Sequence, residues 1–273
     1  MAVRKRRAED IEGAERSTAT TSDNTKSTDS LHSRQCLSVV YKDKRLRVSE
    51  DRSTVTSSSD GGYSSILATC SACSGKWYFE IHVEELGDDS HLRIGWSTRR
   101  TRYDTPLGSD CFSYAIRDTD CARITLGKRW DTTSGDAVTR IRTGDVVGCL
   151  LELPSTVQSP RTVDDPLTFF PNLLCDPENV VGAEIFEQQS SITFFINGKI
   201  VPNCNPHAFV NLVQGEYYPA VSLFGKSKVR FDFDPKETAK KLEARTAADM
   251  FIPASLMKPK KRPTNFIPRG LTA

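Results

Sequence analysis

The sequence is 273 residues long, 37% hydrophobic and 26% charged, with a formal net charge of +2 at pH 7. This length suffices for one large domain or two small ones, of which we favour one domain with tails, and so small a net charge argues against a surface that binds nucleic acid over its whole extent. The longest apolar stretch, 146–151, is far shorter than the roughly 20 residues that cross a bilayer, and eight cysteines without a secretory h-region indicate a reducing compartment.

Residues 1–36 begin with the basic cluster RKRR (4–7) and continue rich in Ser, Thr, Asp and Glu. A segment with so little apolar surface does not offset its ordering entropy, so we expect a disordered tail. The cluster predicts nuclear localisation or contact with nucleic-acid phosphates, and the alternative is a solvated charged tail.

Residues 37–235 contain short apolar alternations separated by Gly, Asp, Ser and Pro, which is typical of an all-β sandwich of two antiparallel sheets. The expected strands are 45–49, 64–69, 76–85, 91–97, 112–116, 123–126, 145–153, 191–196, 217–223 and 228–233. The expected core consists of their inward side chains: Trp77, Phe79, Ile81, Leu92, Ile94, Trp96, Val146, Leu150, Ile192, Phe194, Val221, Phe231 and Phe233.

Turn signals and one long insertion divide this region. Asn197-Gly198 predicts a type I′ hairpin, because both central residues of that turn need positive φ. Gly225-Lys226-Ser227 lacks the first glycine and the following helix of a phosphate-binding loop, so we expect a hairpin turn there. Residues 154–189, with prolines at 154, 160, 166, 171 and 177, are too long for a connecting loop, so we expect a functional or a lineage-specific insertion.

Residues 236–273 predict a short surface helix followed by a second basic cluster, KPKKRP (258–263).

The sequence has no catalytic signature. Cys70 and Cys73 have the spacing of half a zinc site but no second ligand pair, so ordinary buried thiols are expected. His82 and His91 lie near Asp88 and Asp89, and surface histidines beside a polar turn are the simpler interpretation. No nucleophile elbow, activated cysteine or HExxH is present, so we expect no enzyme activity, no metal and no cofactor.

Arg93 and Arg117 are the strongest candidates for a binding site. Arg93 lies on the outward face of its expected strand and Arg117 ends the stretch FSYAIR (112–117), so strand pairing could bring both guanidinium groups to one side of a sheet. Paired guanidinium groups form a planar, permanently charged receptor for carboxylate or phosphate. The alternative is two solvated arginines, or arginines tied to local acids such as Asp118.

The stretches KWYFEIHVEE (76–85), LRIGWS (92–97), PLGSDCFSYAIR (106–117) and ITFFINGK (192–199) occur in the order of the SPRY domain, which the chain resembles. Residues 40–235 further resemble the Ash-two-like subunits of COMPASS-type histone-three lysine-four methyltransferase complexes, because an insertion after LELP (151–154) precedes the ITFFING hairpin.

This resemblance implies a non-catalytic nuclear scaffold that raises the activity of a SET-domain methyltransferase. It further implies binding to an acidic segment of a WD-repeat subunit that resembles the retinoblastoma-binding protein, through Tyr63, Arg93, Pro106 and Arg117. The runner-up is a generic SPRY adaptor of the ubiquitin-ligase receptor or ribonucleoprotein-scaffold type.

The chain departs from the family pattern at several places. Ser109 stands at a position usually held by tyrosine and Thr119 at one usually held by lysine, so a less basic and less aromatic pocket is expected. The family's zinc-finger and winged-helix region does not appear in the sequence. Residues 242–250 lack the apolar anchors of a helix-in-groove contact, which leaves binding of a Dpy-thirty-type subunit open.

Overall fold

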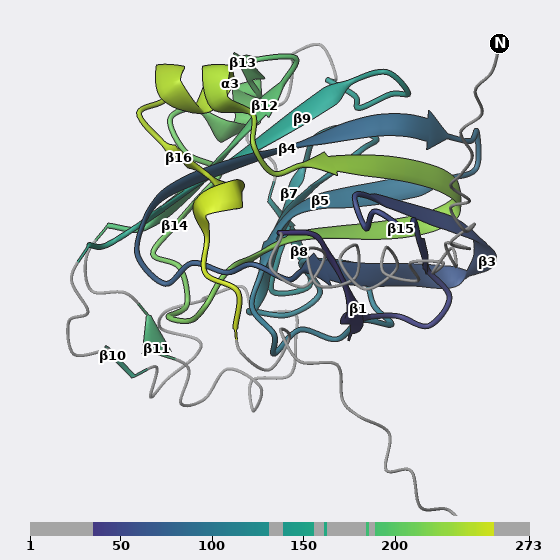
Figure 1. Ribbon diagram of the computed structural model, residues 1–273, viewed down its shortest axis with the longest axis horizontal. Coiled ribbons are helices and arrows are strands. Elements are labelled where there is room, and N and C mark those ends of the chain that lie inside the picture. The colour runs from purple at the N-terminus through teal and green to yellow at the C-terminus, as the bar shows by residue number, and fades with distance from the viewer. Residues whose placement is uncertain (1–34, 131–138, 156–160, 163–183, 186–188, 254–273) are drawn as a thin grey trace, which may run out of the picture.

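The computed structural model describes residues 35–130, 139–155, 161–162, 184–185 and 189–253 (Figure 1). The predicted tails at 1–34 and 254–273, and most of the predicted 154–189 insertion, lie outside the described residues. The strands are β1 (Leu37–Lys42), β2 (Arg47–Val48), β3 (Thr54–Ala68), β4 (Gly75–Leu86), β5 (His91–Ser97), β6 (Ser113–Arg117), β7 (Arg123–Thr125), β8 (Lys128–Trp130), β9 (Val146–Leu153), β10 (Arg161–Thr162), β11 (Glu184–Ile185), β12 (Ser191–Ile196), β13 (Lys199–Ile200), β14 (Phe209–Val210), β15 (Tyr218–Asp232) and β16 (Arg245–Thr246). The helical elements are η2 (Pro202–Cys204), α3 (Lys236–Lys241) and η3 (Ala247–Asp249).

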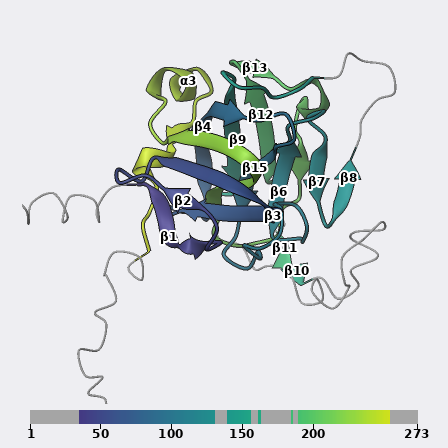
Figure 2. The same ribbon diagram turned by 90° about the vertical axis from the view of Figure 1, so that its right-hand side faces the viewer.

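The long strand β15 joins two antiparallel layers (Figures 1 and 2). Its second half pairs with β4 and its first half with β5, while β3 pairs along the opposite edge. The ladder continues from β4 through β9 and β12, and from β5 through β6, β7 and β8. The predicted all-β, antiparallel architecture is therefore confirmed, and its two layers share one hydrogen-bonded ladder.

Aromatic side chains fill the space between the layers. Phe79 of β4 meets Trp96 of β5 edge to face with ring centroids 4.8 Å apart, and it stacks on Phe231 at 5.8 Å. Phe79 and Trp96 are fully buried. Of the expected core, the inward sets of β4, β5, β12 and β15 are confirmed, because their alternation is regular.

The expected inward set of β9 is wrong. Val147, Cys149 and Leu151 face the core, whereas Val146 is only half-buried and Leu150 packs on the outer side of the layer. Both alternating sets of this strand are apolar, so period two does not distinguish them, and the register with β4 decides the direction.

The turn expected at 225–227 is also wrong. The two strands predicted around it form the single strand β15, whose register against β3 shifts between Leu223 and Gly225. Gly225 has a φ of +66°, and a Cβ atom there would lie 2.7 Å from Ser90 Oγ. The glycine therefore marks a bulge packed against the turn between β4 and β5.

The expected Asn-Gly hairpin turn and the expected short helix are both present. Asn197 and Gly198 adopt φ values of 50° and 76°, as a type I′ turn requires. The short helix α3 covers part of the outer face of β4, where Tyr78 is buried against Leu150 and Phe195. No helix among the described residues is both long and apolar enough to span a membrane.

Candidate anion-binding site

Strand pairing brings the two predicted arginines together on the outer face of one layer. Arg93 of β5 lies directly opposite Arg117 of β6 in the antiparallel register. Their neighbours in the core-facing direction, Leu92 and Ile116, are fully buried, so the alternation directs both arginines away from the core.

Tyr63 extends this site from β3. The register shift in β3 opposite Phe224 creates a bulge, which Arg45 holds by donating to the Tyr63 carbonyl oxygen at 2.8 Å. The Tyr63 ring lies 5.5 Å from the Phe224 ring, and the Arg93 guanidinium lies over Tyr63 at 5.4 Å from its centroid. The Tyr63 ring therefore makes a cation–π contact with the Arg93 guanidinium group.

Arg93 is held in place without a carboxylate partner among the described residues. One of its terminal nitrogens donates to the Leu107 carbonyl oxygen at 2.8 Å, and its buried Nε has no hydrogen-bond partner in the described part of the chain. Burial lowers the pKa of Arg93, and the nearby charge of Arg117 contributes to the same shift. An arginine nevertheless stays charged at neutral pH.

Arg117 is paired with an internal acid, which is Asp120 and not the Asp118 weighed from the sequence. Its Nε donates to Asp120 Oδ1, and a second nitrogen donates to Oδ2, which also accepts from Arg129 at 2.8 Å. Burial alone would raise the pKa of Asp120, but these arginines and the Ala122 backbone N–H lower it overall. Asp120 therefore neutralises part of the positive charge.

Asp118 serves the other end of the site. Its Oδ1 accepts from the Leu92 backbone N–H at 3.1 Å, and its Oδ2 lies 3.1 Å from His91 Nδ1. The His91 ring stacks on Phe224 with centroids 6.0 Å apart. The acid that His91 contacts is therefore Asp118, which is distant in the sequence, and Asp88 and Asp89 had been considered only as an alternative to a surface histidine.

Pro106 lies in the loop that borders the site. The adjacent Leu107 accepts from Arg93, and its N–H donates to Ser222 Oγ at 2.7 Å, which ties the loop to β15. Ser109 closes the turn locally, because its hydroxyl donates to the Pro106 carbonyl oxygen at 2.7 Å. The Thr119 hydroxyl donates to Asp120 Oδ1 at 3.5 Å.

Together these residues form a half-buried site with a net positive charge, which we call the anion-binding shelf. It consists of three arginines (Arg93, Arg117 and Arg129), two carboxylates (Asp118 and Asp120) and the rings of Tyr63, Phe224 and His91. Such a set suits a carboxylate or phosphate on an extended segment, because the guanidinium groups donate and the rings limit hydration. Three residues of this site, Phe224, Asp120 and Arg129, were not predicted from the sequence. Only Asp120, three residues after Arg117, left a local signal.

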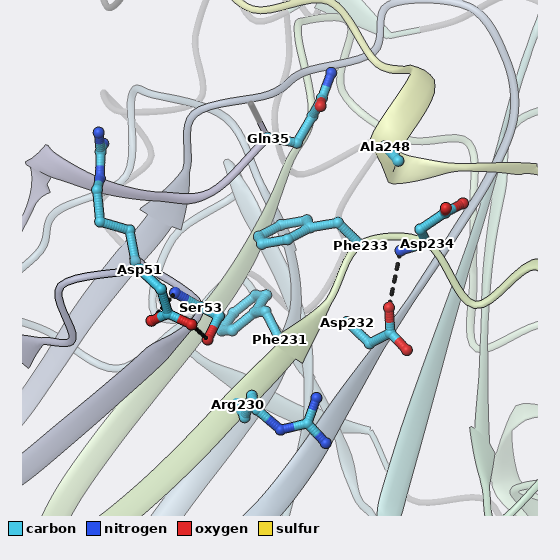
Figure 3. A pocket seen from close by; sticks show the side chains of 10 residues that line it. Gln35, Asp51, Ser53, Arg230, Phe231, Asp232, Phe233, Asp234 and Ala248 are labelled. Atoms are coloured by element: carbon cyan, nitrogen blue, oxygen red, sulfur yellow. Dashed lines mark hydrogen bonds between the residues drawn. The ribbon is translucent and has the colours of Figure 1, made fainter. Parts of the chain in front are cut away.

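A separate cavity of about 440 Å³ lies near the far end of β15 (Figure 3). Figure 3 shows the rings of Phe231 and Phe233 on one side of the strand and the side chains of Arg230 and Asp232 on the other. Arg230 is six residues from Phe224, or about 20 Å along an extended strand. The cavity is therefore not part of the anion-binding site.

Cys70 and Cys73 differ in their exposure to solvent. Cys70 is fully buried, and burial raises its pKa, whereas Cys73 is exposed. The expectation of buried thiols thus holds for Cys70 alone.

Parts of this chain are similar to known proteins. The model of the SPRY domain matches residues 76–158. The Set1/Ash2 histone methyltransferase complex subunit ASH2 of Drosophila melanogaster is 33% identical over 202 residues, 70% of this chain and 34% of that protein. The subunit ash-2 of Caenorhabditis elegans is 28% identical over 76% of this chain and 38% of its own length. The SPRY domain of human HERC1 aligns with a TM-score of 0.45 at 16% identity, covering 71% of this chain and 96% of that one. The chain thus spans about a third of the length of these curated relatives.

Proposed function

Because the chain contains a SPRY domain and is homologous to the ASH2 subunits of Set1 complexes, we propose that it is a subunit of a COMPASS-like histone-three lysine-four methyltransferase complex. Its role is that of a nuclear scaffold without chemistry of its own. Two relatives are named as subunits of a Set1/Ash2 histone methyltransferase complex, which supports a role beside a SET-domain methyltransferase and a place in the nucleus.

The anion-binding shelf is the contact surface in this proposal. It receives an acidic segment of a WD-repeat subunit, which lies along β5 and β6 with a carboxylate or phosphate at Arg93. The main support for this proposal is the half-buried guanidinium group of Arg93. It lies over the Tyr63 ring, and Arg93 is opposite Arg117 in the register. It has no carboxylate partner in the described ranges. Each charge-assisted hydrogen bond to such a ligand contributes about 1.5 to 3 kcal/mol.

Two features limit the affinity of this shelf. The Arg117 guanidinium already donates hydrogen bonds to the Asp120 carboxylate, so a ligand must share these donors with Asp120 or displace it. The Ser109 hydroxyl donates to the Pro106 carbonyl oxygen within the same loop, and a serine side chain adds no aromatic surface to the site. We therefore propose that Arg93 and Tyr63 make the principal contacts, with Arg117 and Pro106 contributing less.

Scaffolding raises turnover through differential binding. A subunit that binds the active arrangement of the methyltransferase and its WD-repeat partner more tightly than other arrangements shifts the population toward it. No group on this chain then needs to touch the substrate.

A pull-down from nuclear extract tests the proposal. The double variant Arg93→Ala with Arg117→Ala should lose the WD-repeat subunit, whereas Arg142→Ala, which removes an exposed arginine at residue 142, should retain it. Circular dichroism and urea unfolding verify that the double variant is folded. Retention of the WD-repeat subunit by the folded double variant would refute the role of the shelf.

A further inference from the structure

A second group of polar side chains lies on the outer face of the other layer, away from the anion-binding shelf. Glu80 and His82 are two residues apart on β4, and Asp232 of β15 is directly opposite Glu80 in the register. One ligand atom from each of the three lies within 4.8 Å of the others. All three side chains are half-buried. We propose that Glu80, His82 and Asp232 bind a zinc ion.

The two carboxylates are not balanced by cations. Neither Glu80 nor Asp232 has an ion-pair partner among the residues that the structure describes, and like charges directly opposite on neighbouring strands are destabilising. The nearest register neighbour with a positive charge is Arg230, opposite His82. Its Nε donates to Glu84 Oε1 at 3.2 Å, and Glu84 also pairs with Lys228. A bound cation would supply the missing charge.

The imidazole of His82 supplies an independent observation. Its Nε2 is buried and has no hydrogen-bond partner within the described ranges. A buried polar atom of this kind costs free energy unless a partner satisfies it. A neutral imidazole nitrogen is a strong ligand for zinc, whereas magnesium and calcium prefer oxygen ligands only. The donor set therefore favours a transition-metal ion.

Neighbouring groups orient the two carboxylates. Tyr78 Oη donates to Glu80 Oε1 at 2.9 Å, and the Asp234 backbone N–H donates to Asp232 Oδ1 at 2.9 Å. Tyr78 reaches this position only because residue 148 is glycine, where a Cβ atom would lie 2.0 Å from Tyr78 Oη. The second oxygen of each carboxylate has no hydrogen bond in the described part of the chain. These contacts have the form of an outer shell around metal ligands.

The three ligand atoms must move slightly closer together to bind one ion. They now lie within 4.8 Å of one another, whereas ligand atoms 2.0–2.2 Å from a tetrahedral zinc ion are about 3.4 Å apart. Rotation of the side chains can supply this movement, and the Glu80 side chain has three torsions. Three protein ligands leave the fourth position to water or to a ligand from another molecule.

Zinc alone, titrated into the full chain under reducing conditions in competition with a chromophoric chelator, tests the site. The wild type should bind one equivalent, and His82→Gln, Glu80→Gln and Asp232→Asn should each weaken it at least tenfold. Tyr78→Phe, which removes only the hydrogen bond to Glu80, should weaken it about tenfold. The matched control His207→Gln, at a histidine that contacts Thr193, should bind as the wild type does.

Cobalt substitution separates this site from the cysteines. Cobalt held by nitrogen and oxygen gives a visible spectrum without a thiolate charge-transfer band, and that spectrum should disappear in His82→Gln. Unfolding curves without metal verify that each variant is folded, and at the same zinc concentration the unfolding midpoint should rise more for the wild type than for Glu80→Gln. A thiolate band, equal binding by folded His82→Gln, or no saturable binding in the micromolar range would overturn the proposal.

Discussion

Replacement of Asp120 by asparagine should increase the affinity of the anion-binding shelf while lowering stability. Asn keeps the shape and one acceptor oxygen, but it puts an amide donor where Oδ2 now accepts from Arg117 and Arg129. Losing these charge-assisted bonds should lower the free energy of unfolding by about 1–3 kcal/mol. The two guanidinium groups then lose this negatively charged partner, and less of their positive charge is neutralised within the site.

The gain in affinity follows from the charge that is removed. A unit charge about 6 Å from a ligand carboxylate contributes about 3 kcal/mol at an effective dielectric constant of about 20. The Arg117 side chain is 31% exposed, so solvent and salt screen roughly half of this. We therefore expect about tenfold tighter binding, which corresponds to about 1.4 kcal/mol.

Fluorescence anisotropy with a labelled polyglutamate peptide, with and without a phosphoserine, measures this gain. Asp104→Asn is the matched control, because it removes the same charge from an exposed pair with Arg102 and should leave affinity nearly unchanged. Unchanged or weaker binding by folded Asp120→Asn would mean that Arg117 is not part of the receptor.

Three further predictions concern the fold and its dependence on pH. Phe79→Ala removes the central ring between the layers and should lower the free energy of unfolding by about 3–5 kcal/mol in urea titrations; an unchanged midpoint would contradict the packing of the two layers. Gly148→Ala places a Cβ atom 2.0 Å from Tyr78 Oη and should cost about 1–3 kcal/mol, and full stability would show that Tyr78 lies elsewhere. The pKa of Asp120 is lowered by folding, so its stabilisation is present above the unfolded-state pKa of about 3.9 and is lost as pH falls through the lower folded-state value. The stability difference between wild type and Asp120→Asn should therefore shrink from about pH 5 to about pH 2, and a constant difference would be inconsistent with this pairing.

Strands with one apolar face could be predicted from the sequence with their side-chain directions. The expected bounds of β5 and β12 match the structure, and the inward set of β4 is confirmed. The direction of β9 could not be predicted, because both of its faces are apolar and its partner strand fixes the register. The bulge at Gly225 was mistaken for a turn, since a glycine in an apolar alternation is compatible with either.

The candidate site was predictable only in part. Alternation and strand order placed Arg93 and Arg117 on one face, and the family resemblance added Tyr63 and Pro106. The groups that contact Tyr63 and Arg93 come from other segments of the chain: Phe224 lies on β15, and Leu107 lies on a loop that Ser222 fixes. Such contacts depend on the folded topology and leave no trace in local spacing.

Methyl transfer to histone three by a SET-domain methyltransferase, reconstituted with its WD-repeat subunit, tests the central claim most directly. The chain should have no activity alone and should raise the turnover of the reconstituted pair, and the folded Arg93→Ala, Arg117→Ala double variant should lose most of this stimulation. Full stimulation by the double variant, or methyl transfer by the isolated chain, would contradict the account.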